Sequence, residues 1–154
     1  MKPFIAFEEI KPISTEKKPW GKSELLFYSP FFQLNRIFVD RGWRCSLHYH
    51  KHKENFFYVF DGKLAIRQYR NILGKLEKKE MINGDYISEE RYLKTSENLL
   101  IKSKSMSVPS LCLHQFQSLT EVVAMEWYIP SIPGVDISLE DIIRVSEING
   151  KKVE

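Results

Sequence analysis

Residues 42–62 read GWRCSLHYHKHKENFFYVFDG, and this stretch decides the fold. Residues 44–50 and the aromatic run 56–60 suit strands better than helices. Asp61-Gly62 follows directly and is typical of a tight hairpin turn, which leads into a further strand over 63–69. The stretch therefore predicts consecutive short strands joined by turns.

The rest of the chain continues this pattern. Two apolar runs flank Ser29-Pro30 between residues 24 and 39, and further strands are predicted over 99–101, 106–108, 113–116 and 122–129. Many short strands at even turn spacing indicate an all-β barrel or double-sheet jelly roll. One helix is expected at the end of the chain, because Ser138 and Asp141 form a capping-box-like start before an apolar face.

The length of 154 residues suits one domain with short additions. Three prolines and several lysines predict an extended N-terminal arm over residues 1–20. The barrel is expected over 21–136, with a charged insertion or hairpin loop at 71–98. The predicted C-terminal helix and tail occupy 137–154.

Composition narrows the class of protein. With 43% hydrophobic and 28% charged residues, the chain is typical of a soluble globular protein. The net charge of +3 comes from scattered basic residues, so we expect no nucleic-acid partner. Neither a signal peptide nor a membrane-spanning apolar run is expected, and two cysteines form no disulfide framework. These features predict a cytoplasmic protein.

Three of the four histidines lie within residues 47–52. On a strand His48 and His50 point to the same side, which is the geometry that two imidazoles need to bind one metal ion. His114 lies on a later predicted strand, where it could complete the set. By the same alternation Cys45 should point away. The alternative is that the pair forms only a polar strand face.

The spacing around these histidines resembles the two cupin motifs. Five residues separate Gly42 from His48, four separate His50 from Asn55, and six separate Asn55 from Gly62, as in the first motif. Pro109 followed by His114 and Phe116 is similar to the second. The resemblance implies a cupin double-stranded β-helix and a divalent metal (Mn, Fe, Ni or Zn) held by His48, His50, His114 and Asn55.

Four segments are similar to small sugar-modifying cupins and type II mannose-6-phosphate isomerases. They are Lys18-Pro19-Trp20-Gly21 with Glu24, the pair of segments CSLHYH (45–50) and FYVFDG (57–62), and residues 139–151. The resemblance covers most of residues 18–151, apart from the insertion at 71–98. It implies a sugar or sugar-phosphate ligand and a homodimer.

The chain departs from the cupin pattern at three places. Asn55 stands where the family has a metal-binding glutamate, and Glu54 would face the other side of the strand. Ser103-Lys104 replaces the Gly-Asp of the second motif, and Leu111 replaces its later glycine. An amide oxygen can bind a metal but carries no charge, so we expect altered metal affinity or activity.

Four residues are candidates for binding or chemistry beside the metal. Glu126 lies on the last long strand, where related sugar cupins also carry a glutamate; it is either a proton-transferring base or a buried acid that orients a histidine. Lys53 and Arg67 are candidates for binding a substrate phosphate, with a solvated rim as the alternative. Tyr128 shares the parity of Glu126 and is a further candidate for substrate binding.

Three functions remain open from the sequence. The first is a metal-dependent sugar-phosphate isomerase or epimerase. The second is a non-catalytic sugar-binding cupin with a degenerate metal site. The third is a three-histidine Fe(II) dioxygenase-like cupin, against which the sugar-type segments at both ends of the chain argue.

Overall fold

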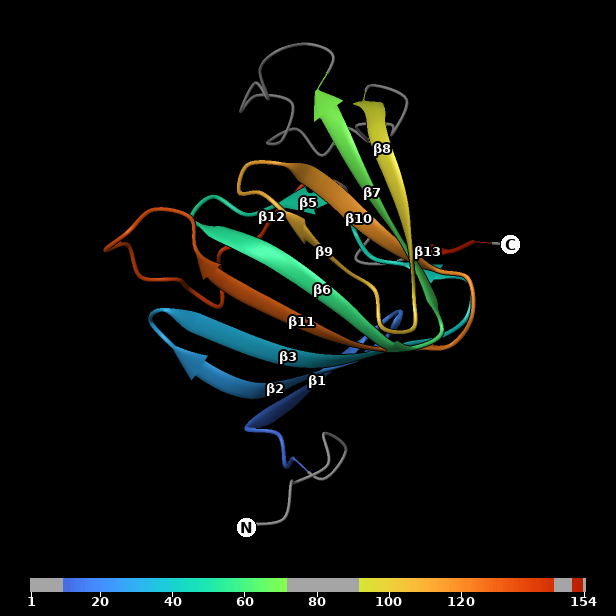
Figure 1. Cartoon of the computed structure of the whole chain (residues 1–154), viewed down its shortest axis with the longest axis horizontal. Coiled ribbons are helices and arrows are strands. Elements are labelled where there is room, and N and C mark those ends of the chain that lie inside the picture. The colour runs from blue at the N-terminus through green and yellow to red at the C-terminus, as the bar shows by residue number, and fades with distance from the viewer. Residues whose placement is uncertain (1–9, 72–91, 146–150, 154) are drawn as a thin grey trace.

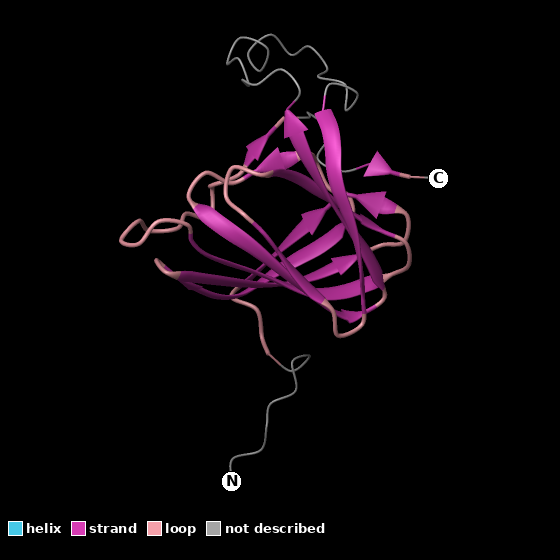
Figure 2. Cartoon of the chain, turned by 45° about the horizontal axis from the view of Figure 1, so that its top comes forward, coloured by secondary structure: helices cyan, strands magenta, loops and turns pink. Residues whose placement is uncertain are grey.

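The computed structural model describes residues 10–71, 92–145 and 151–153, and these residues form strands joined by loops (Figure 2). One antiparallel sheet has six strands in the order β1-β2-β3-β11-β6-β9. Its strands are β1 (Ser14–Lys18), β2 (Gly21–Ser29), β3 (Phe32–Val39), β11 (Val122–Pro130), β6 (Lys53–Asp61) and β9 (Ser105–Val108).

The second sheet faces the first, so that the two enclose one interior (Figures 1 and 2). Its path runs β12-β5-β10-β4-β13, and β7 pairs with both β10 and β8. These strands are β12 (Ile143–Arg144), β5 (His48–Tyr49), β10 (Leu113–Ser118), β4 (Trp43–Arg44), β13 (Lys151–Lys152), β7 (Lys63–Asn71) and β8 (Tyr92–Ile101). The predicted all-β double-sheet jelly roll is confirmed.

Turn chemistry explains the hairpins. Gly62 has φ 90° between β6 and β7, and a Cβ there would collide with the carbonyl oxygen of Glu121. Gly21, the first residue of β2, has φ 137°, and a Cβ there would meet the carbonyl oxygen of Phe38. Only glycine fits such backbone positions without strain.

The predicted C-terminal helix is wrong. Residues 138–142 form tight turns, with the amide of Asp141 bonded to the carbonyl of Ser138 and that of Ile142 to the carbonyl of Glu140. Ile143 and Arg144 then pair with β5 as strand β12. The Ser138 carbonyl also accepts a hydrogen bond from Lys53 Nζ, so tertiary contacts use groups that a helix would need. The predicted tail beyond residue 145 lies largely outside the described residues.

Two other predicted segments are partly described. Within the arm at residues 1–20, β1 pairs with β2 along its whole length. The insertion at 71–98 contains the end of β7 and part of β8, which pair with each other; residues 72–91 lie outside the described part of the chain. No helix in the described ranges is long and apolar enough to cross a membrane.

The apolar core lies between the sheets. Ile37, Phe57, Val59, Leu64 and Ile66 are each at most 1% exposed and belong to one cluster that both sheets supply. Along β6, Phe57 and Val59 alternate with partly exposed residues, as a half-buried strand requires.

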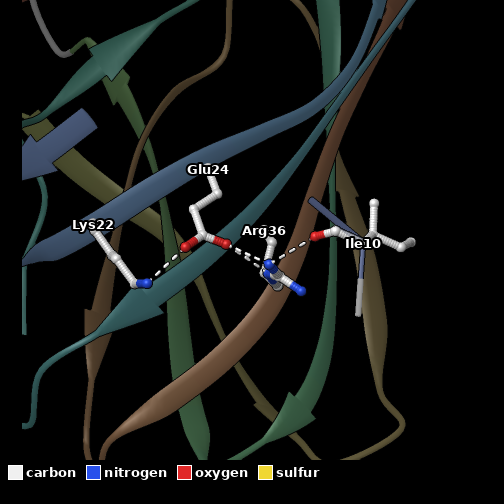
Figure 3. Close-up of polar contacts among 4 residues, drawn as sticks. All are labelled: Ile10, Lys22, Glu24 and Arg36. Carbon is white, nitrogen blue, oxygen red and sulfur yellow. Dashed lines mark hydrogen bonds and ion pairs between the residues drawn. The ribbon is translucent and has the colours of Figure 1, made fainter. Parts of the chain in front are cut away.

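A charged network lies on the opposite side of the six-stranded sheet. The Glu24 carboxylate accepts hydrogen bonds from Lys22 Nζ at 2.6 Å and Arg36 Nε at 2.7 Å, while Arg36 Nη2 also reaches the carbonyl of Ile10 at 3.2 Å (Figure 3). Burial raises the pKa of Glu24, but the two cations outweigh it and hold that pKa below its ordinary value.

Candidate metal centre

The structure brings His48, His50 and His114 together. His48 on β5 lies directly opposite His114 on β10 in the antiparallel register, and His50 follows β5 on the same side. The ring centroids of His48 and His114 are 4.5 Å apart, and that of His50 lies 5.2 and 5.5 Å from theirs. One nitrogen from each ring lies within 4.8 Å of the others.

Backbone carbonyls fix the tautomer of all three rings. The Nδ1 atoms of His48, His50 and His114 lie 2.7, 2.5 and 2.9 Å from the carbonyl oxygens of Ser46, Asp141 and Cys112. A carbonyl can only accept, so each Nδ1 carries the proton and each Nε2 keeps its lone pair. This is the arrangement in which histidine binds a metal through Nε2.

Burial keeps these imidazoles neutral. It lowers the pKa of His50 to about 3 and that of His114 to about 4, and it lowers the pKa of His48 well below its ordinary value. The neighbouring imidazoles add to the effect at His48 and His50. Neutral imidazole is the form that coordinates metals, so no proton has to leave these rings at neutral pH.

Asn55 on β6 is the remaining candidate ligand. It is 0% exposed, and its Nδ2 donates to Glu126 Oε1 at 3.0 Å, which leaves the amide oxygen free. Tyr128 lies opposite Asn55 on β11, and its ring centroid is 5.1 Å from that of His50. Glu54, one position earlier, falls on the half-buried outer face of β6.

Three of these candidate ligands carry buried atoms that have no hydrogen-bond partner. Among the described residues, the buried side-chain atoms that lack a hydrogen bond include His50 Nε2, His114 Nε2 and Asn55 Oδ1. Leaving buried polar atoms unpaired is costly, and a bound cation is one way in which such lone pairs are satisfied. Imidazole nitrogens with one oxygen suit Zn, Fe or Ni, so the residues fit a divalent metal.

A cavity of about 350 Å³ adjoins the histidines. Its lining includes His48, His50, Lys53, Glu126 and Tyr128, together with Gln33 and Asn35 from β3. Asn55 and His114 are not part of that lining. The cavity therefore has histidine nitrogens, a carboxylate and an ammonium group on its walls.

Glu126 is buried on the inner face of β11. Its carboxylate accepts hydrogen bonds from Asn55, Tyr128 and Asn35. Burial raises the pKa of Glu126, although these hydrogen bonds and the charge of Lys53 oppose the rise. The carboxylate is thus held in a fixed position beside the cavity.

Lys53 and Arg67 occupy different environments. Lys53 is 2% exposed, donates to the Ser138 carbonyl at 2.9 Å and lies 4.3 Å from the Tyr128 ring centroid. Burial lowers its pKa to about 8, opposed by the charges of Asp141 and Glu126. Arg67 lies on β7, pairs with Glu97 on β8 at 2.6 Å, and does not line the cavity.

Comparison with known proteins settles the fold. No family model matches the chain, and no curated protein sequence does. Among solved structures, KdgF from Halomonas sp. superposes with a TM-score of 0.57 at 13% identity, over 83% of this chain and 94% of KdgF. An RmlC-like cupin from Shewanella frigidimarina gives 0.56 at 16% identity, over 86% of this chain and 95% of that one. The chain has the RmlC-like cupin fold.

CapF from Staphylococcus aureus, a capsular polysaccharide assembling protein, superposes with a TM-score of 0.60 at 16% identity. The superposition covers 90% of this chain but only 35% of CapF. The chain described here therefore spans about a third of the length of CapF.

Two turns have a non-glycine residue with positive φ. Ser103 has φ 66° and Leu111 has φ 61°, and they are the non-glycine residues in the described chain with positive φ. They stand at positions where the resemblance to the second cupin motif implies glycine. Both turns therefore carry the strain that a side chain brings at positive φ.

Two features of the cupin site were not expected from the sequence. Asp141 accepts hydrogen bonds from the amides of Lys51 and His52 at 2.9 Å each, and its own carbonyl holds His50. The resemblance of residues 139–151 to related cupins was the available signal. Cys45 lines the cavity, contrary to prediction, because residues 45–47 are not a regular strand and alternation does not carry through them.

Proposed function

We propose that this cupin binds a divalent metal and acts on a sugar or sugar phosphate, as an isomerase or epimerase. The observation that carries the proposal is the group of unpartnered lone pairs on His50, His114 and Asn55 beside a cavity of about 350 Å³. The segments that resemble sugar-modifying cupins support the substrate class, as does the likeness in fold to CapF.

The roles follow from position. His48, His50, His114 and Asn55 would hold the metal, which supplies Lewis-acid polarisation of a carbonyl or hydroxyl group. Glu126 lines the cavity and would take a proton from one carbon and return it to the next, since its buried carboxylate has a raised pKa. Lys53 would bind the phosphate or another oxyanion, and Tyr128 would contact the sugar.

A second candidate is a sugar-binding cupin without catalysis. The specific observation in its favour is that three side chains donate to Glu126, which leaves this carboxylate less free to accept a proton. Saturable sugar binding without turnover would support this candidate. Oxygen uptake that depends on Fe(II) would instead support a dioxygenase-like activity.

Metal analysis is the first experiment. Tag-free wild-type protein should contain near-stoichiometric Mn, Fe, Ni or Zn, and His48→Ala/His50→Ala should contain none. His52→Ala is the matched control, because His52 lies in the same segment but is exposed. No metal in the wild type, even after soaking, would overturn the proposal.

Turnover is tested next with the loaded protein. Wild type should interconvert an aldose phosphate and its ketose or epimer, and Glu126→Gln should lower kcat at least about a hundredfold if it moves the proton. Metal-loaded wild type that binds sugars without converting any of them would favour the second candidate.

The oligomeric state is part of the proposal. Aromatic side chains on the outer face of the six-stranded sheet support a homodimer, among them Phe56 and Trp127, whose rings stack at 5.4 Å. Light scattering after size exclusion should give twice the chain mass. The cytoplasmic location remains a prediction.

A further inference from the structure

Asn55 raises a problem that a carboxylate ligand would not have. A glutamate presents oxygen whichever way it turns, but an amide presents oxygen on one side and an NH₂ group on the other. The NH₂ group would repel a cation. A metal site that contains Asn55 therefore needs something that decides which end of the amide faces the metal.

Glu126 is in a position to set the orientation of the Asn55 amide. Asn55 Nδ2 donates to Glu126 Oε1 at 3.0 Å, and both residues are on inward faces of neighbouring strands. A carboxylate has no proton to donate, so it accepts only the NH₂ end of the amide. Asn35 and Tyr128 also donate to this carboxylate and hold it in place.

The amide oxygen is the free end. Asn55 Oδ1 is buried and has no hydrogen-bond partner, and the same is true of His50 Nε2 and His114 Nε2. Three neutral imidazoles and a neutral amide bring no negative charge to a dication. The Glu126 carboxylate lies one hydrogen bond behind the amide, in a buried environment where charge interactions are strong.

We propose that Glu126 is a positioning residue that turns the oxygen of Asn55 toward the metal and supplies, through that hydrogen bond, the negative charge that the ligands lack. The inference rests on the metal-binding part of the proposed function, not on sugar turnover. It assigns the pair Asn55–Glu126 the work that a single carboxylate ligand would otherwise do.

A cycle of four proteins tests the pair: wild type, Glu126→Gln, Asn55→Asp and Asn55→Asp/Glu126→Gln. Co²⁺ titrations give dissociation constants and visible spectra. Glu126→Gln should weaken Co²⁺ binding about 10- to 100-fold when residue 55 is Asn, as loss of an outer partner of a metal ligand does. It should not weaken binding when residue 55 is Asp, because the Gln amide can then donate to the new carboxylate.

The inference would be overturned if Glu126→Gln changed the Co²⁺ dissociation constant equally whether residue 55 is Asn or Asp. It would also be overturned if Glu126→Gln had no effect when residue 55 is Asn. Asn35→Ala is the matched control: it removes another donor to Glu126 but leaves the Asn55 bond, and should change the dissociation constant much less. Urea unfolding of each metal-free variant shows that it is folded. If Glu126→Gln does not fold, Glu126→Asp keeps the charge but withdraws it from Asn55 and should weaken binding too.

A second readout needs no metal. In ¹⁵N-labelled apo protein, the Asn55 side-chain NH₂ signals, identified by their loss in Asn55→Asp, should exchange slowly with solvent and shift in Glu126→Gln. The inference would be contradicted if these signals exchanged rapidly with solvent and had the same chemical shifts in Glu126→Gln as in the wild type. Wild type that binds no Co²⁺ overturns the proposed function and the inference together, whereas binding with additive effects overturns the inference alone.

Discussion

The two halves of the barrel interior differ in chemistry although the same strands build both. On β6 the inward residues change from Lys53 and Asn55 to Phe57 and Val59, and on β11 they change from Glu126 and Tyr128 to Ala124 and Val122. β3 follows the same rule, with Gln33 and Asn35 before Ile37 and Val39. One half is a closed apolar core, and the other surrounds the cavity.

The difference separates stability from function. Apolar side chains gain about 25 cal/mol per Å² removed from water, so the apolar half stabilises the fold whether or not a ligand is present. Buried polar groups cost free energy unless they are paired. The histidine half therefore contributes little to the stability of the apo protein. Its contribution should increase when a bound ligand uses its lone pairs.

The largest expected effect is in the apolar half. Phe57→Ala should lower the free energy of unfolding by about 3–5 kcal/mol, because it leaves a cavity where Phe57 is 1% exposed. Phe56→Ala, on the outer face of the same strand, should cost clearly less. Urea unfolding of both variants measures this difference. Equal decreases in the free energy of unfolding would show that the apolar interior contributes no more to stability than the outer face of the same strand.

Metal addition tests the polar half. A divalent metal at about 100 times its dissociation constant should stabilise the wild type by about 2.7 kcal/mol. His48→Ala/His50→Ala should show no such gain, while Phe56→Ala should keep it. The measurement is the change in urea midpoint with and without metal; equal stabilisation of the double variant would place the binding elsewhere.

The buried ion pair on the outer face gives a pH-dependent effect. Glu24→Gln should lower the free energy of unfolding by about 1.5–3 kcal/mol near neutral pH, because it weakens charged hydrogen bonds to Lys22 and Arg36. The folded-state pKa of Glu24 is lowered, so its contribution is complete above the unfolded pKa and disappears as pH falls through the folded one.

Urea unfolding of wild type and Glu24→Gln over a series of pH values follows this. The difference between the two proteins should shrink on acidification below roughly pH 4.5. A difference that grows at acid pH would show that the carboxylate destabilises the sheet. The metal response of the polar half should be unchanged in Glu24→Gln at neutral pH.

The smallest effect concerns the strained turns. Leu111→Gly should raise the free energy of unfolding by roughly 0.5–1 kcal/mol. A φ of 61° costs a residue with a side chain about 1–2 kcal/mol, and the larger conformational entropy that glycine loses on folding offsets part of the gain. Leu111 is 68% exposed, so little packing is lost. Gly134→Ala is the reverse control: Gly134 has φ 80° with open space around it, and the change should destabilise. Thermal unfolding that ranks these two variants the other way would contradict the strain argument.

Local pattern was enough to predict the strands and part of the site. Alternation placed His48 and His50 on one side of their segment and Glu126 and Tyr128 on one face of theirs, because the side-chain period of a strand is fixed by its backbone. That this face of β11 points inward came from the structure. Asp61-Gly62 located a hairpin for the same kind of reason, since it depends only on allowed φ values. The metal identity of the site and the substrate are not local properties and stay predictions.

The remaining features came from pairing between distant segments. The register of β5 and β10 sets His114 opposite His48, and contacts of residues 138–141 with Lys51, His52 and Lys53 replace the helix that the local sequence predicted. Only the fold brings Glu126 to Asn55 and so determines which end of the amide is free. The sequence by itself determined where most of the strands lie and which of their residues share a face, whereas tertiary structure decided which buried polar groups found partners and which remained available to a ligand, because hydrogen-bond partners many residues apart are selected by packing and register.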